Sequence, residues 1–243
     1  MALISEGTES NQIAVPPKAY RSEAELKIRE ALEQWGRTRY PGARQCHELV
    51  VGRGNGRADL AYVMPADIAA VEIKSAFDST ERLLHQAAMF LLASPVVWIC
   101  YDTEHSEDAA MMRYLLPWLG LIRATRLKDG KPLSRSAPDR DFTIGLEVIA
   151  EPVRRDPHPR ALLSLCWAGE LATEAQRRLV WQGKLNKLPG HAALVGMMAG
   201  TLSAAEQMES VCRQLRSRNA FWRADPPIND GARVAPAAEA VLV

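Results

Sequence analysis

The sequence predicts an α/β protein with a mixed β-sheet flanked by helices, followed by a small all-helical unit. Up to about residue 155, segments with the apolar patterns of strands are interspersed with amphipathic helical segments. From residue 156 onward the periodicity is helical only. We therefore expect a flexible leader over residues 1–19, a core over 20–155, a helical unit over 156–224 and a flexible tail over 225–243.

Local signals predict the elements of the core. Ser22 as N-cap, with Glu25 three residues later, begins an amphipathic helix, and DSTE from Asp78 predicts a second capping box and a helix through Leu92. The continuous apolar run VVWICY at 96–101 is typical of a buried central strand. The other expected elements are strands within 45–51, 51–64 and 68–75, the third antiparallel to the second, a helix at 107–120, a basic turn-rich segment over 123–140 and a strand at 143–150.

Three segments with helical periodicity predict the C-terminal unit, at residues 159–171, 173–182 and 203–217. Asp156 before a proline is a typical N-cap. Trp167, Trp181 and Trp222 lie among the basic residues of this unit, where they could stack on bases. Tryptophans at helical spacing are more often core residues, so the pattern leaves both roles open.

Composition indicates an ordinary globular protein, because 47% of the 243 residues are hydrophobic and 24% are charged. The four cysteines are scattered and form no Cys-x-x-Cys pair, which predicts reduced thiols in a cytoplasm. We find neither a signal-peptide pattern nor an uninterrupted apolar run of about 18 residues. The sequence therefore predicts a soluble, intracellular protein with no membrane partner.

The net charge of +1 hides an asymmetry along the chain. Residues 1–120 carry 12 basic and 16 acidic residues, whereas residues 121–223 carry 17 basic and 10 acidic ones. An acidic first half suits a site that gathers cations, and a basic second half suits a surface that binds phosphates. A solvated helix face would produce the same imbalance.

The segment VEIKS places two charged residues on one face of the third strand. Side chains alternate between faces with a period of two, so Glu72 and Lys74 project together while Ile73 points to the other face. Such a pair can be a surface ion pair that contributes less than about 1 kcal/mol. It can also be the acid and the lysine of a nuclease.

A second carboxylate strengthens the nuclease interpretation. Asp59 lies on the preceding strand, and the turn at Pro65 would bring the two strands together as a hairpin. Asp59, Glu72 and the backbone carbonyl of Ile73 would then form an all-oxygen site suited to Mg²⁺ or Mn²⁺. Lys74 would orient or deprotonate a water or stabilise the charged phosphorus centre.

Asp59, then Glu72-Ile73-Lys74, then a helix carrying Gln86 resemble the PD-(D/E)XK nuclease superfamily, which has a restriction-endonuclease-like fold. GRADLAYV, VEIKSAFDSTERLLHQAAMF and VVWICY are similar in order and spacing to a set of phage and bacterial proteins of that superfamily. The similarity covers about residues 20–120, and more faintly 161–218.

The resemblance implies roles for individual residues. Asp59 and Glu72 match the metal-binding acids, Lys74 matches the lysine that positions the nucleophilic water, and Gln86 matches a glutamine near the site. Ala58 stands where the family name has proline, and Phe90 replaces a tyrosine, which makes Phe90 a core residue.

Further site residues are less defined. An additional acid could be Glu48 on the first strand, which we prefer as a metal ligand, or Glu25 or Glu30 on the first helix. Three arginines could contact a DNA backbone: Arg53, Arg57 and Arg82. Arg82 could instead pair with Asp78 or Glu81 on its own helix.

The sequence therefore predicts a Mg²⁺- or Mn²⁺-dependent deoxyribonuclease of the bacterial cytoplasm, encoded by a phage as the resemblance implies. The basic segment from Arg123 to Arg223 would grip DNA through its phosphates. The pattern does not distinguish DNA from RNA, and a homo-oligomer is compatible with it. The alternative is a non-catalytic nucleic-acid-binding or regulatory protein on a nuclease fold.

Overall fold

The computed structural model describes residues 23–54, 56–76, 78–133, 141–184, 187–219, 221 and 223–229. The expected leader, the tail after residue 229, the Ser22 cap and Trp222 lie outside the described residues. No helix in the described ranges combines the length and the apolar character that crossing a membrane requires.

The described chain forms one mixed sheet with the order β1-β2-β3-β4-β5-β6, and β7 also pairs with β5. Strands β1 to β3 form an antiparallel meander, β4 and β5 continue in parallel, and β6 and β7 return antiparallel to β5. The apolar run at 96–101 is the buried central strand β4, as predicted. The strands are β1 Arg44–Val51, β2 Gly56–Met64, β3 Asp67–Lys74, β4 Val96–Asp102, β5 Gly120–Lys128, β6 Lys131–Pro132 and β7 Thr143–Ala150.

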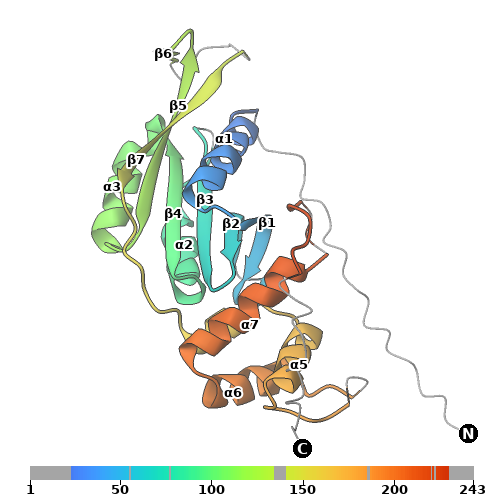
Figure 1. Ribbon diagram of the computed structural model, residues 1–243. Helices are drawn as coiled ribbons and strands as arrows, with labels where there is room; N and C mark the ends of the chain where they lie inside the picture. The colour runs from blue at the N-terminus through green and yellow to red at the C-terminus, as the bar shows by residue number, and fades with distance from the viewer. Residues whose placement is uncertain are drawn as a thin grey trace, which may run out of the picture.

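Helices cover both faces of the sheet (Figure 1). Helix α1 packs on one face over a core that includes Ile28, Leu32 and Trp98. Helices α2 and α3 and the C-terminal helices share a second core on the other face. The helices are α1 Glu23–Arg39, α2 Leu83–Ala93, α3 Ser106–Leu115, α4 Pro159–Leu163, α5 Ala168–Arg177, α6 His191–Thr201 and α7 Ala204–Ser217, with short 3-10 turns η1 Gly52–Gly54 and η2 Thr103–His105.

Three core elements differ from the sequence prediction. Helix α3, expected over 107–120, ends at Leu115. Helix α2 begins at Leu83 and not near Asp78, because the Asp78 carboxylate accepts hydrogen bonds from the backbone N–H and hydroxyl of Ser75 and closes a turn there. Strand β5 occupies part of the segment expected to be turn-rich. Its burial nearly alternates, with Arg123 and Arg126 on opposite faces of a regular strand.

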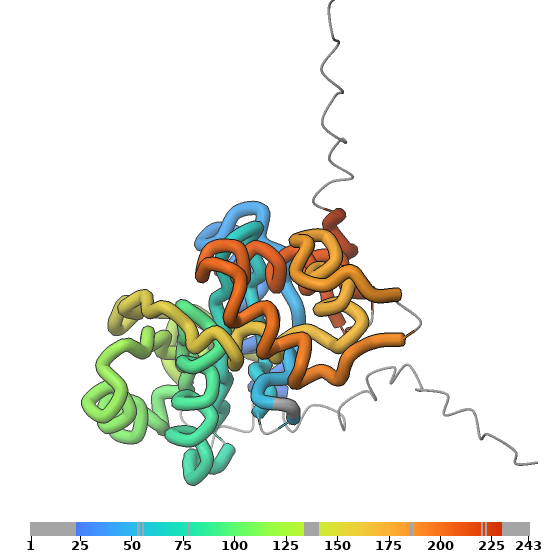
Figure 2. Tube along the Cα trace, turned by 90° about the horizontal axis from the view of Figure 1, so that it is seen from below, coloured from blue at the N-terminus to red at the C-terminus, as the bar shows by residue number. Residues whose placement is uncertain are grey.

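The C-terminal helices join the same apolar core as one face of the sheet. The connection from β7 runs past the ends of three core elements (Figure 2). Its backbone N–H groups donate to backbone carbonyl oxygens there: Val153 to Trp118, Arg155 to Pro95 and His158 to Leu92. After α7, the chain returns to the edge strand β1, where Ala224 bridges to Cys46. The helical unit is therefore attached to the sheet at two places, through the segment before α4 and through the segment after α7. Helix α6 was not expected from the sequence.

Four cysteines of the described chain are buried and form no disulfide bond, at Cys46, Cys100, Cys166 and Cys212. Burial raises the pKa of the Cys46 thiol to about 12. A protonated thiol is a poor nucleophile, so this side chain behaves as a small core residue.

Arg44 joins the sheet to the end of α7. This buried side chain donates from Nη1 to the carbonyl oxygens of Leu215, Arg216 and Arg218, at 2.8, 2.9 and 2.7 Å. The last carbonyl groups of a helix have no partner within the helix, so one guanidinium satisfies several of them at once.

Replacement Arg44→Ala should lower the free energy of unfolding by about 3 kcal/mol, because it leaves buried carbonyl groups without donors. Urea unfolding followed by circular dichroism measures this. Arg37→Ala is the matched control, since Arg37 is exposed and pairs with Asp225, and it should cost less than about 1 kcal/mol. Equal losses in the two variants would contradict the role given to Arg44.

Candidate functional site

The candidate site lies where β2 separates from β3 while it stays paired with β1. The pairing of β2 with β3 runs from Met64↔Asp67 to Leu60↔Val71 and ends there. On the other side, the β1–β2 register passes from His47↔Leu60 to Leu49↔Ala58, with Glu48 in a left-handed backbone conformation at φ 59°. Asp59 and Glu72 therefore lie just past the last regular β2–β3 pair.

Asp59 replaces the missing strand pairing with its side chain. Its Oδ2 atom accepts a hydrogen bond of 2.7 Å from the backbone N–H of Ile73. Its backbone carbonyl accepts a hydrogen bond from Nη1 of Arg29. The Asp59 carboxylate is thereby fixed beside the Glu72–Ile73 peptide, as the predicted hairpin requires.

Glu72, Lys74 and Gln86 form a second group at the same place. The Lys74 ammonium lies 2.9 Å from Oε1 of Glu72 and donates to Oε1 of Gln86 at 3.3 Å. Glu72 and Lys74 are 2% and 8% exposed, so this is not the solvated surface pair that the sequence left open. Phe90, one turn after Gln86 on α2, is fully buried and is a core residue, as expected.

Arg29 of α1 is the residue that sequence reasoning missed. Its Nη2 atom lies 3.0 Å from a carboxylate oxygen of Glu25, 3.4 Å from one of Glu48 and 3.5 Å from one of Asp59. The Arg29 side chain is 2% exposed. One buried guanidinium thus balances three carboxylates from a helix and two strands.

A sequence signal for Arg29 existed. It follows Ile28 of the apolar stripe and stands four residues after Glu25, so it lies at the edge of the buried face with an acid one turn away. A basic residue at the border of an apolar stripe is usually solvated, and only the tertiary fold shows that this one is buried.

Burial and mutual repulsion raise the pKa of the acids. The pKa of Glu72 is raised to about 8, first by burial and then by the Asp59 charge, while Lys74 and Gln86 oppose the shift. Burial also raises the pKa of Asp59 against the effect of Arg29, and that of Glu48, where Asp59 adds to the shift. Each of these carboxylates would be easier to ionise with additional positive charge beside it.

The structure distinguishes among the three candidates for the additional acid. Glu25 and Glu48 both contact Arg29, whereas Glu30 is exposed on α1. The second carboxylate oxygen of Glu48 pairs with Arg57. Glu48 and Glu25 therefore both border the site, and Glu48 is held by two arginines.

The predicted DNA-contacting arginines lie around this position. Arg57 is half exposed while it holds Glu48. Arg82 is exposed at the N-terminal end of α2, and the predicted partner Asp78 bonds Ser75. The side chain of Arg53 lies outside the described part of the structure.

The donor chemistry suits a divalent cation, but its ligand set is incomplete. Asp59 and Glu72 supply hard oxygen donors, and Oε2 of Glu72 is buried with no hydrogen-bond partner among the described residues. Across the described ranges, no three His, Cys, Asp or Glu side chains form a group that could hold a metal ion. Nothing in the structure tests the Ile73 carbonyl as a ligand.

Residues 17–132 match a protein family described as "Bacteriophage P4 protein cII". The matched segment extends from before α1 to β6 and contains every residue of the candidate site. No curated protein and no solved structure matched the sequence.

Replacement Glu72→Gln should flatten the pH dependence of stability. The pKa of Glu72 is raised from 4.5 to about 8 on folding, so its contribution is fully present below pH 4.5 and is lost as the pH rises through 8. From pH 5 to 9 the wild type should lose roughly 4 kcal/mol more of unfolding free energy than Glu72→Gln.

Urea unfolding in EDTA at pH 5, 7 and 9 measures the difference. Glu30→Gln is the control, since its carboxylate is exposed and should leave the pH profile of the wild type unchanged. Parallel pH profiles for wild type and Glu72→Gln would contradict the burial argument.

Proposed function

We propose that the core has a restriction-endonuclease-like fold of the PD-(D/E)XK type. The order α1-β1-β2-β3-α2-β4 supports this, with an antiparallel meander followed by the parallel strand β4. Helices α1 and α2 pack on opposite faces of this sheet. The Asp59, Glu72 and Lys74 positions that motivated the resemblance fall at one point of it.

The proposed activity is metal-dependent hydrolysis of phosphodiester bonds in DNA. The observation that carries it is the convergence of Asp59, Glu72, Lys74 and Gln86 where β2 and β3 separate. A Mg²⁺ or Mn²⁺ ion bound by Asp59 and Glu72 would lower the pKa of a water and neutralise phosphate charge.

The chain's own residues would share the remaining work. Lys74, held between Glu72 and Gln86, would orient the attacking water or stabilise the negative charge that develops on the phosphate. Asp59 is held in place by the Ile73 N–H, so its position does not depend on the ion. Half-exposed Arg57 would contact the DNA backbone beside the site.

A second function is supported by separate observations. Arg29 already balances the acids, and the described residues contain no preassembled three-ligand group. A phage-encoded protein that binds nucleic acid or regulates without cutting fits both facts. The similarity to the phage P4 family favours this second function over hydrolysis.

The deciding experiment incubates the protein with linear, circular and single-stranded DNA and with RNA, in Mg²⁺, Mn²⁺ or EDTA. Hydrolysis predicts cleavage that EDTA abolishes and that Asp59→Asn and Lys74→Ala each slow roughly 100-fold or more. Glu30→Gln, exposed on α1, should cleave as the wild type does.

The outcomes separate the two functions. Cleavage at equal rates in wild type, Asp59→Asn and Lys74→Ala would contradict the site. Binding of nucleic acid without cleavage in either metal would establish the second function, and gel-shift measurement on the same samples reports it.

A further inference from the structure

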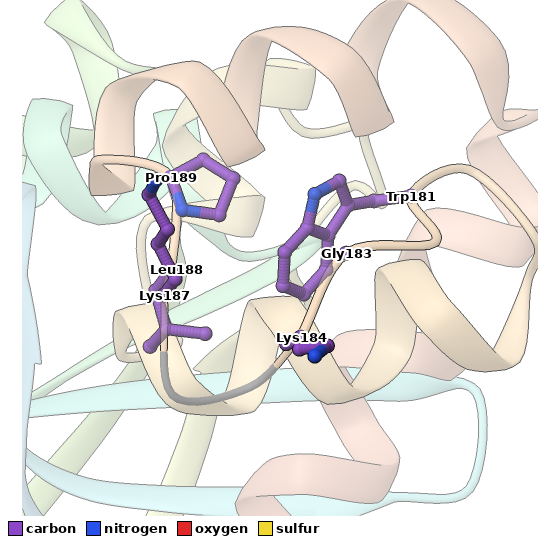
Figure 3. A pocket seen from close by; sticks show the side chains of 6 residues that line it. All are labelled: Trp181, Gly183, Lys184, Lys187, Leu188 and Pro189. Carbon is purple, nitrogen blue, oxygen red and sulfur yellow. The ribbon is translucent and has the colours of Figure 1, made fainter.

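A cavity of about 710 Å³ opens in the C-terminal unit, between α5 and α6. Figure 3 shows the Trp181 indole and the Pro189 ring on opposite sides of it. The cavity is lined by Trp181, Gly183, Lys184, Lys187, Leu188 and Pro189. Its size is within the range of about 300–1,000 Å³ that is usual for ligand pockets.

Hydrogen bonds to α5 fix one wall of this cavity. The backbone N–H of Trp181 donates to the carbonyl oxygen of Ala175 at 3.2 Å, and the side-chain amide of Gln176 donates to the carbonyl oxygen of Gly183. On the opposite wall, Pro189 directly precedes Gly190, the N-cap of α6. The two walls are therefore anchored on separate helices.

The position of the Trp181 ring depends on Gly183. A Cβ atom added to Gly183 would lie 2.3 Å from the indole, closer than atoms in contact can approach. The ring thus packs directly on the glycine backbone. Trp181 is only partly buried and packs on the apolar core, while it also lines the cavity.

The charge at the cavity is positive. Lys184 and Lys187 are exposed lining residues, and the described part of the lining contains no acidic side chain. Neither ammonium makes an ion pair with the described residues, whereas nearby Arg178 pairs with Glu206 and Glu209. The two lysines are thus available to an anionic ligand.

We propose that this cavity binds a nucleotide unit, with its base stacked on Trp181 and its phosphate held by Lys184 and Lys187. The Trp181 indole in the wall of the cavity suits a flat aromatic group, and the lysines suit the phosphate attached to it. An acidic peptide would satisfy the lysines but would leave the indole without an aromatic partner.

This site is separate from the site at Asp59 and Glu72 and does not depend on hydrolysis there. It would give the C-terminal unit its own contact with nucleic acid, in a cutting or a non-cutting protein. Single-stranded DNA and a free nucleotide share the required chemistry, so the experiment includes both.

The test is fluorescence anisotropy with a labelled 12-nucleotide oligo-dT, in EDTA so that no cleavage occurs. Trp181→Ala should weaken binding roughly 5- to 150-fold, the usual effect of losing one base stack, and Trp181→Phe should restore most of it. The double variant Lys184→Ala/Lys187→Ala should reduce the slope of log Kd against log salt by about 1.4.

Gly183→Ala tests the geometry without removing an aromatic or a charge. It should weaken binding as Trp181→Ala does, because the added methyl group displaces the indole. Tyr114→Ala is the control for an exposed aromatic, since Tyr114 is 82% exposed on α3 and does not line the cavity. It should bind as the wild type does.

A second readout locates the ligand. The indole N–H signal of Trp181 is assigned as the one of six that disappears in the Trp181→Phe spectrum, and oligo-dT should shift it. A shift by thymidine monophosphate as well would identify free nucleotides as ligands, and a shift by the oligonucleotide alone would restrict the site to strands. Folded variants with unchanged affinity, or binding of poly-glutamate in place of oligo-dT, would overturn the proposal.

Discussion

The interaction on which the candidate site depends is the hydrogen bond from the Ile73 N–H to the Asp59 carboxylate. It forms because β2 and β3 stop pairing after Leu60↔Val71, so a side chain takes the place of a strand partner. This brings a second carboxylate beside Glu72 in a poorly hydrated position, where like charges repel. The buried cations of the site follow from that constraint, because the acids need opposite charge nearby.

Several layers of the fold supply this charge or hold it in position. Helix α1 brings Arg29 from one face, strand β3 carries Lys74, and α2 brings Gln86 to Lys74 from the other face. The C-terminal helices hold the sheet through Arg44, whose donors reach the end of α7. A buried ion network of this kind stabilises only when it is complete, so the site ties function to the stability of the whole fold.

The sequence predicted the mixed sheet, the central position of β4 and the convergence of Asp59, Glu72 and Lys74, because period-two alternation and one hairpin turn determine them locally. The place of Gln86 beside them was implied only by the resemblance to the nuclease superfamily. It placed the start of α2 too early, since DSTE resembles a capping box while Asp78 closes a turn on Ser75. It missed β5, because the basic residues of this strand are also typical of an exposed loop. It also missed Arg29, because burial of a charge depends on partners from β1 and β2 that no local pattern shows.

The most direct measurement of the central claim is thermal and urea unfolding of Arg29→Met, with and without millimolar Mn²⁺. If the acids require a cation, the variant should lose about 3–5 kcal/mol, and Mn²⁺ should restore part of that loss while it affects the wild type less. Arg39→Met, on an exposed position of α1, is the matched control and should change little. An Arg29→Met protein as stable as the wild type, with no response to Mn²⁺, would contradict the account.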